Sequence, residues 1–257
     1  LMFTSQDNLI DRTRRAAAAT QAEALALGGE ASVVAALQRD LITGPDTDNF
    51  TEDWALIQQA PMQLATGTFS VTIVDAQALF DINQLADGGL VKTQVFALLI
   101  AQAGIPASVG QGIINQVQSA GPLADLDALR DLDDTTLSTL KTLFVALPVP
   151  GNVNLNTSTM PVLSAVLGNP ATASRLLALR DRQGFITPTD LANLGGLAAT
   201  GIGFSSDVYD VKVTAGVDDA VITLNSRILR LRRTPAEREV RVISRKLSAP
   251  ALTQPSN

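Results

Sequence analysis

The sequence predicts an α+β fold in which a long N-terminal helix packs on an antiparallel sheet, and the sheet is interrupted by an inserted helical block. Three observations support this prediction. Residues 4–41 are rich in helix formers and lack proline, residues 69–74 and the segment after 204 alternate apolar and polar side chains, and residues 90–199 show helical periodicity. Because the sheet cannot be completed until the chain leaves the helical block, the block is an insertion and not a tandem domain.

The composition limits the chemistry open to this chain. Its 257 residues suffice for one large or two ordinary domains, and a hydrophobic content of 46% is typical of an ordered globular protein. Histidine and cysteine are absent from the sequence, which excludes imidazole bases, thiolate nucleophiles, disulfides and zinc sites built from these residues. Catalysis by carboxylates and the binding of metals through oxygen ligands remain possible for this composition.

The first predicted element is one long helix, or two helices in line, over residues 4–41, roughly 55 Å long at 1.5 Å per residue. Gly44 and Pro45 mark its end, because glycine terminates helices and proline cannot continue them. Gly28 and Gly29 interrupt its pattern. Since such a helix is longer than a small domain is wide, its early turns are expected to project from the body and pack on partner helices.

An acidic loop follows the helix and carries the candidate metal ligands. Asp46, Asp48 and Glu52 place three carboxylates on a short segment, and calcium prefers hard oxygen ligands of this kind. Their spacing differs from that of an EF-hand loop, and the glycine that such a loop needs is missing. A solvated acidic loop is therefore the alternative interpretation.

The helical block, residues 85–203, contains an internal near-repeat at an offset of 63 to 65 residues. Two copies of one helical hairpin, each too small to bury its own apolar face, are expected to pack against each other. The repeat matches Leu98, Ile105-Pro106, Ile113-Ile114, Gly121 and 125–129 with Leu163, Asn169-Pro170, Leu176-Leu177, Gly184 and 190–194.

Two groups of polar residues in this region are interpreted as architectural. Asparagine is common in turns, where its side-chain amide binds local backbone groups. We expect this role for Asn83, Asn152, Asn154 and Asn156. A helix is predicted over residues 135–147, and the acidic run before it consists of Asp131, Asp133 and Asp134. We expect these aspartates to cap the N-terminus of that helix and to stabilise it through its dipole. A further helix is predicted over 160–167.

Three strands are predicted to complete the sheet, over 209–214, 221–231 and 239–247, with a turn at 234–237. Residues 221–257 carry eight basic and two acidic residues. We expect them to form arginine-rich exposed strand faces that pair with acidic neighbours, and contact with nucleic acid is the alternative. The predicted organisation is a discontinuous domain of residues 1–84 and 204–248, the inserted domain 85–203, and a flexible tail 249–257.

Four stretches resemble, in the same order, those of the type II secretion minor pseudopilin K family, also called general secretion pathway protein K. They are DAQALFDINQL (75–85), GNVNLNTS (151–158), RDRQGFI (180–186) leading into TDL (189–191), and FSSDVY (204–209). The resemblance implies a pseudopilin fold with a helical insertion, and a structural protein that caps the tip of a periplasmic pseudopilus and helps initiate its assembly. The bulk of the insertion fits a tip position on steric grounds.

The resemblance also implies partners, a location and a cofactor. The partners would be the minor pseudopilins I and J in a ternary tip complex, with pseudopilin H below. The location would be the inner membrane and periplasm of a Gram-negative bacterium, with the membrane helix of the family expected ahead of residue 1. Members of the family hold calcium in or near the helical insertion, so calcium is implied, while the ligands proposed above rest on the loop alone.

Two other classes of function were weighed against this one. Helix-hairpin-helix modules bind nucleic acid through hairpin amides and nearby cations, and Gly201-Ile202-Gly203 spells such a hairpin. However, residues 85–203 hold six basic and eight acidic residues, whereas phosphate binding needs clustered positive charge. A carboxylate hydrolase would need a pair such as Asp133 and Asp190 at a defined separation, which the sequence does not supply. We therefore predict neither nucleic-acid binding nor catalysis.

Overall fold

The computed structural model describes residues 3–195, 201–234 and 237–248. Its internal contacts divide the chain into two compact units, the first formed by residues 1–44, 53–74 and 209–257 and the second by residues 45–52 and 75–208. The sequence placed the inserted block at 85–203, and the contacts group 45–52 and 75–84 with it as well. The predicted tail 249–257, and residues 235–236 of the predicted turn, lie outside the described residues.

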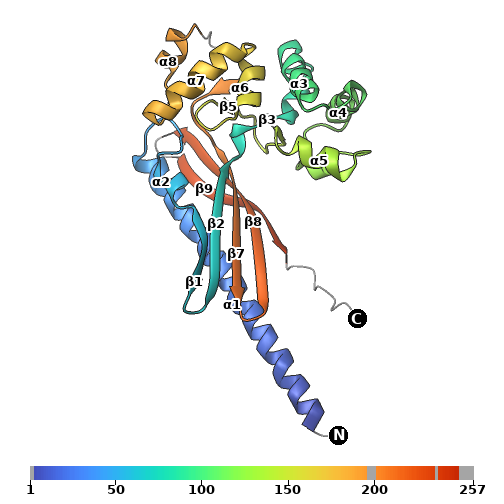
Figure 1. Cartoon of the computed structure of the whole chain (residues 1–257), viewed down its shortest axis with the longest axis vertical. Helices are drawn as coiled ribbons and strands as arrows, with labels where there is room; N and C mark the ends of the chain where they lie inside the picture. The colour runs from blue at the N-terminus through green and yellow to red at the C-terminus, as the bar shows by residue number, and fades with distance from the viewer. Residues whose placement is uncertain (1–2, 196–200, 235–236, 249–257) are drawn as a thin grey trace. The chain divides into compact units, whose positions relative to one another are not determined.

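The first unit is a long helix packed on one face of a five-stranded sheet (Figure 1). The helix is α1 (Phe3–Thr43), followed by the short α2 (Asp53–Leu56), and the strand order is β1-β2-β7-β8-β9. The strands are β1 (Gln59–Leu64), β2 (Gly67–Asp75), β7 (Val208–Val217), β8 (Ala220–Thr234) and β9 (Glu237–Ser248). The predicted helix on an antiparallel sheet is thus confirmed, and β1 is a strand that the sequence did not predict.

The close packing of α1 on the sheet depends on Gly29. A Cβ atom at Gly29 would lie 2.7 Å from Phe69 Cζ and 2.8 Å from Val213 Cγ1, so a larger side chain would push the helix away. Gly28 faces the other way and has nothing within 4 Å of such a Cβ. The helix continues through both glycines, because the packing of Ala26, Val33 and Leu37 in the core holds it in place.

Two ion pairs in the first unit, one of them fully buried, join α1 to the last two strands. The guanidinium of Arg230 is fully buried, pairs with Asp40 and donates to Tyr209 Oη at 2.7 Å. Arg245 on β9 binds both oxygens of Glu30, at 2.6 to 3.0 Å. Burial of Glu30 disfavours its charge, but the hydrogen bonds from Arg245 and Ser226 outweigh this effect and lower its pKa. The predicted pairing of the basic strands with acidic neighbours is confirmed at these positions.

The second unit is mainly helical. Its α-helices are α3 (Leu90–Gln102), α4 (Ala107–Ala120), α5 (Asp134–Leu140), α6 (Met160–Leu167), α7 (Pro170–Gln183) and α8 (Pro188–Asn193), with 3-10 turns at Ala76–Ala78, Ile82–Leu85 and Leu126–Ala128. Two short parallel strand pairs join them: β3 (Phe80–Asp81) with β4 (Phe144–Val145), and β5 (Val153–Asn154) with β6 (Ile202–Gly203).

These strand pairs correct two sequence predictions. The insertion is not wholly helical, and the helix predicted over 135–147 ends at Leu140 because Phe144 and Val145 form β4. Gly201-Ile202-Gly203 does not form a helical hairpin either, since Ile202–Gly203 is a strand. The helix over 160–167 is confirmed as α6.

The two hairpins α3–α4 and α6–α7 have glycine and proline at corresponding helix ends. Gly104 and Gly168, with φ of 69° and 60°, end the first helix of each hairpin, and a proline follows two residues later, at Pro106 and Pro170. The second helices end at Gly121 and Gly184, with φ of 80° and 91°. These left-handed positions favour glycine, since other side chains are strained there.

Candidate functional site

The acidic loop separates the three predicted metal ligands into two environments. Asp48 and Glu52 are buried, whereas Asp46 is exposed. Ser206 N donates to Asp48 Oδ2 at 2.6 Å, while the backbone N and the side-chain Nδ2 of Asn49 donate to Glu52 Oε1 at 3.1 and 2.7 Å. One carboxylate oxygen of Asp48 lies within 4.8 Å of one of Glu52. Two buried carboxylates this close could hold a cation, and their oxygen donors fit calcium in kind.

A further buried carboxylate, that of Asp75, connects distant segments of the second unit. It stands at the end of β2, and its Oδ2 accepts hydrogen bonds from Asn154 Nδ2 at 3.0 Å, Thr157 Oγ1 at 2.6 Å and Ser206 Oγ at 2.6 Å. Its Oδ1 accepts from Gln77 N at 2.8 Å. We call Asp48, Asp75, Asn154, Thr157 and Ser206 the buried polar cluster.

The surroundings of Asp75 disfavour its charged form. Complete burial raises its pKa to about 6, and the charge of Asp48 acts in the same direction, although hydrogen bonds from Ser206 and Thr157 oppose the rise. Sequence reasoning did not single out Asp75, Thr157 or Ser206 as a site. The signal that could have found them is that each lies in one of the stretches that carry the family resemblance.

The asparagines predicted to be architectural bind backbone groups. Asn83 exchanges hydrogen bonds with the backbone of Leu123, donating at 2.9 Å and accepting at 2.8 Å. Asn156 does the same with Ile186, at 3.1 and 2.7 Å. The side chain of Asn154 belongs to the buried polar cluster, whereas Asn152 contributes its carbonyl, which accepts from Gln77 Nε2. The architectural role is therefore confirmed for Asn83 and Asn156, but their backbone partners are 40 and 30 residues away and not local as predicted. Asn154 makes the predicted local contact, since its Oδ1 accepts from Asn156 N at 3.0 Å.

The two aspartates considered for catalysis both cap helices. Asp133 is the N-cap of α5 and accepts from Thr136 N at 2.7 Å, which lowers its pKa. Asp190 completes a capping box with Thr187 at the start of α8, and these hydrogen bonds lower its pKa as well. The predicted capping role of Asp133 is confirmed. A carboxylate held ionised in this way is poorly suited to act as a general acid.

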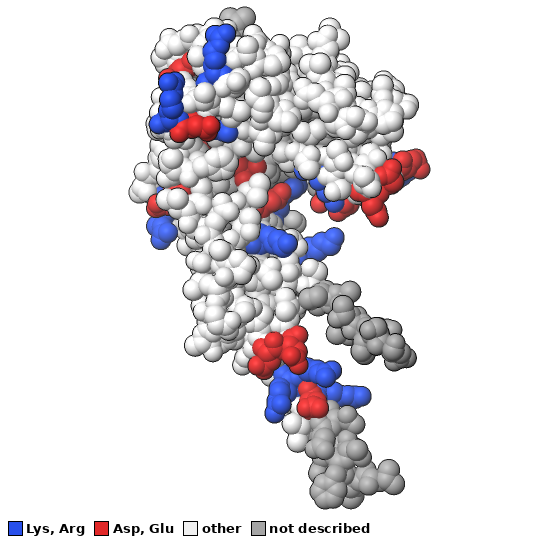
Figure 2. Space-filling view, viewed as in Figure 1, with Lys and Arg blue, Asp and Glu red and all other residues white. Residues whose placement is uncertain are grey.

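The early turns of α1 form an exposed helical segment. Residues 9–17 are exposed on every side, with Leu9 68% and Ile10 57% accessible, and the first buried residue that follows them is Ala18. Both signs of charge appear on this segment (Figure 2). Within the described residues, no helix is long and apolar enough to cross a membrane. Exposed apolar side chains on a helix that nothing covers favour packing against other helices.

Comparison with known proteins places this architecture in a class. The fold matches a chain in the crystal structure of the GspK-GspI-GspJ complex from the type 2 secretion system of enterotoxigenic Escherichia coli. The TM-score is 0.71 at 21% sequence identity, and the match covers 92% of this chain and 99% of the other. The long helix, the antiparallel sheet and the helical insertion therefore define a protein with the GspK fold.

Two sequence comparisons agree with the structural one. Residues 153–212, which include three members of the buried polar cluster, match the family described as type II secretion system (T2SS), protein K. A type II secretion system protein K from Pseudomonas aeruginosa PAO1 is 28% identical over 211 residues, in a match that covers 66% of this chain and 63% of that protein. The chain thus spans less than two thirds of the length of this relative. In these stretches the chain is similar in sequence to type II secretion system protein K.

Proposed function

We propose that this chain is a minor pseudopilin that caps the tip of a type II secretion pseudopilus and helps initiate its assembly. It is a structural protein and not an enzyme. It acts on the periplasmic side of the inner membrane of a Gram-negative bacterium, in a ternary complex with the pseudopilins I and J and above pseudopilin H. The observation that carries the proposal is the exposed segment 9–17 of α1, because a helix that its own sheet does not cover offers a surface to partner helices.

The second unit has the features expected of a tip subunit with a duplicated insertion. We infer that α3–α4 and α6–α7 are two copies of one module within the inserted domain. The shared glycine and proline positions support this inference. The hydrogen bonds that Asn83 exchanges with Leu123 in one copy also correspond to those that Asn156 exchanges with Ile186 in the other. Each copy is also accompanied by a parallel strand pair. A block of this size would crowd the neighbouring subunits inside a filament, which favours a terminal position.

We also propose that the folded chain binds calcium through Asp48 and Glu52. The closeness of the two buried carboxylates supports this proposal, since they repel each other unless a cation or a proton intervenes. Calcium takes six to eight oxygen ligands, so the two carboxylates would supply part of its shell.

The experiment that tests the proposed function measures complex formation with the cognate pseudopilins I and J. The full chain should bind them in a stable ternary complex by size-exclusion chromatography. Removing residues 4–15 should weaken binding while leaving the thermal midpoint almost unchanged, because residues 9–15 are exposed and do not belong to the core. Failure of the full chain to bind I and J would contradict the proposal, and a large fall in midpoint would mean that the segment stabilises the fold instead.

A further inference from the structure

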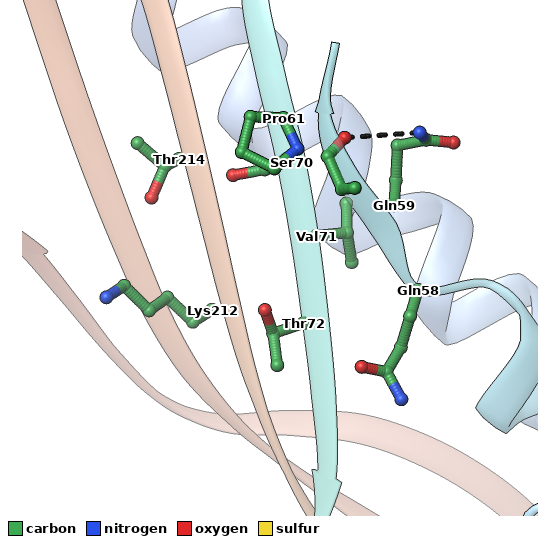
Figure 3. Close-up of a pocket in the computed structure, with 9 residues that line it drawn as sticks. Gln58, Gln59, Pro61, Ser70, Val71, Thr72, Lys212 and Thr214 are labelled. Atoms are coloured by element: carbon green, nitrogen blue, oxygen red, sulfur yellow. Dashed lines mark hydrogen bonds between the residues drawn. The ribbon is translucent and has the colours of Figure 1, made fainter.

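The face of the sheet opposite α1 carries a hollow beside β1. Its volume is about 460 Å³ (Figure 3). It arises from a bulge, since Gln59 pairs with Val71 but Met62 pairs with Phe69, so that residues 60–61 lie opposite Ser70 alone. Pro61 within the bulge has no N–H, which makes this edge unsuitable for the addition of another strand. A partner would therefore engage the face through side chains.

Hydrogen-bond donors line the hollow. Side chains of Ser70, Thr72, Lys212 and Thr214 line the hollow, with Gln58 and Gln59 at its rim. In Figure 3 the side chain of Lys212 extends away from the two glutamines, so its ammonium group lies beside the hollow on the open face. None of the residues lining this hollow is acidic. A cation beside hydroxyl groups suits a carboxylate, which can accept charge-assisted hydrogen bonds from it.

Lys212 belongs to a row that contains a second lysine. On this face two side-chain hydrogen bonds join β7 to β8. The Oγ1 atoms of Thr214 and Thr223 are 3.4 Å apart, and Arg227 Nε donates to Asp210 Oδ1 at 2.7 Å. Lys212 lies between these contacts and across from Asn225, which pairs with Lys246 on β9. Since neighbouring strands are about 4.8 Å apart, the Cα atoms of the two lysines are separated by roughly 10 Å.

The four lysines of the chain divide into two kinds. Lys92 and Lys141 in the second unit pair with Asp87 and Asp127, at 2.8 and 2.5 Å. Within the part of the chain that the structure describes, Lys212 and Lys246 have no ion pair and no hydrogen bond from their side chains. The nearby Arg227 is bound by Asp210. The two lysines are therefore a net positive pair on a polar face.

We propose that this face docks an acidic segment of a partner pseudopilin, with Lys212 and Lys246 as its anchors. This inference rests on the proposed function, and it adds a second surface to the one that α1 offers. Opposite charges at such a contact set its orientation and speed its association. A second copy of the chain would bring lysine against lysine, which is unfavourable. Two lysines also fall short of the roughly 4–8 clustered cations typical of binding to anionic lipids.

Charge reversal at the two lysines tests this docking surface. Isothermal titration calorimetry would measure the affinity of the cognate I–J pair for the full chain and for its Lys212→Glu, Lys246→Glu and double variants. Each single change should weaken binding about tenfold, or about 1.4 kcal/mol, and the double change should weaken it further. The affinity of the double variant should also depend less on salt, because the screened attraction is gone. Lys212→Arg keeps the charge and should bind nearly as well as the unaltered chain.

Matched controls come from the paired lysines of the second unit. Lys92→Glu and Lys141→Glu make the same change in net charge and should leave the affinity within about twofold, a difference of about 0.4 kcal/mol. Thermal midpoints would establish that all variants fold. If the full chain binds I–J and the face variants bind equally well, the docking surface is wrong and the proposed function stands. If the full chain does not bind I–J, both fail. Binding to anionic lipid vesicles that both face variants abolish would assign the face to a membrane instead.

Discussion

Asp75 accepts four hydrogen bonds in the interior of the second unit, so its charge affects the free energy of folding. Its pKa in the folded chain is about 6, above the ordinary 3.8 of an aspartate. The folded state therefore binds a proton more tightly than the unfolded state does. The resulting stability is fully present below pH 3.8 and is lost as the pH rises through 6.

We therefore expect the free energy of unfolding to increase as the solution is acidified. Between pH 7.5 and 4.5 the contribution of Asp75 should amount to about 2 kcal/mol. Urea unfolding at several pH values in the presence of a chelator would measure it. Asp75→Asn cannot titrate and should flatten the dependence, whereas Asp190→Asn should not, because the lowered pKa of Asp190 acts only at lower pH. An Asp75→Asn variant that keeps the full pH dependence would contradict this account.

Calcium should raise the thermal midpoint of the chain if Asp48 and Glu52 form its site. An ion that binds only the folded state stabilises it by about 2.7 kcal/mol at a hundredfold excess over its dissociation constant. Magnesium should have less effect, since it requires near-octahedral geometry and releases water reluctantly. Melting curves with calcium, magnesium or chelator would measure the gain.

Variants of the loop locate the ion. Glu52→Gln and Asp48→Asn should reduce the gain that calcium gives, whatever they do to the midpoint without it. The exposed Asp46 is the natural control, and Asp46→Asn should keep the gain. A calcium effect that survives both changes in the buried pair would place the ion elsewhere in the chain, and an unchanged midpoint with all additions would exclude the metal.

Contacts between residues close in the sequence could be predicted, whereas contacts between distant residues could not. Asp133 was identified as a helix cap because its partner, Thr136, is three residues away. Asp75 was not identified as a cluster residue because Ser206 lies 131 residues further along the chain. The pattern of the acidic loop did not reveal that Asp48 and Glu52 turn inward while Asp46 faces solvent.

Among the elements, α1 contains a pair of glycines with opposite roles. Gly28→Ala should stabilise the chain by about 0.5–1 kcal/mol, since alanine is the better helix former and its methyl group meets nothing. Gly29→Ala should destabilise it despite the same gain in helix propensity, because the methyl group would collide with Phe69 and Val213. Thermal or urea unfolding of the two variants, compared side by side, measures both effects. Equal effects at the two positions would contradict the packing described here.

The elements that the sequence missed are those whose pattern is weak or whose partner is distant. Strand β1, with the sequence QAPMQL, has no alternation and contains Pro61, and it exists because β2 offers it a partner. The apolar run after Leu140 suited a continuing helix, but pairing of Phe144 with Phe80 made it a strand. By contrast, the extent of α1 was predicted closely, since most of its residues are helix formers, whereas its continuity through Gly28 and Gly29 depends on packing in the core.

At the scale of the whole molecule, a tip subunit is needed once per filament, so the purified chain should not form filaments. We expect a monomer by size-exclusion chromatography with light scattering, at micromolar concentrations and over a range of salt. The basis is that the helical insertion obstructs stacking of like subunits and that the open sheet face carries lysines that repel another copy. Polymerisation of the purified chain would remove the main support for a tip position.

The hydrogen bond between Asp75 and Ser206 also bears on the order in which the chain acquires its structure. Strands β2 and β7 are neighbours in the sheet, yet β2 ends at Asp75 and β7 begins at Val208, so pairing them directly means closing a very long loop. Contacts of such high sequence separation slow folding. The second unit ties Asp75 to Ser206 within its own interior, and once it has formed, the loop left to close is only a few residues long and its entropic cost is small. We therefore expect amide protection in pulsed hydrogen exchange to arise in α3, α4, α6 and α7 before it arises in β7 and β8, so that the inserted block acts as the template on which the interrupted sheet is completed.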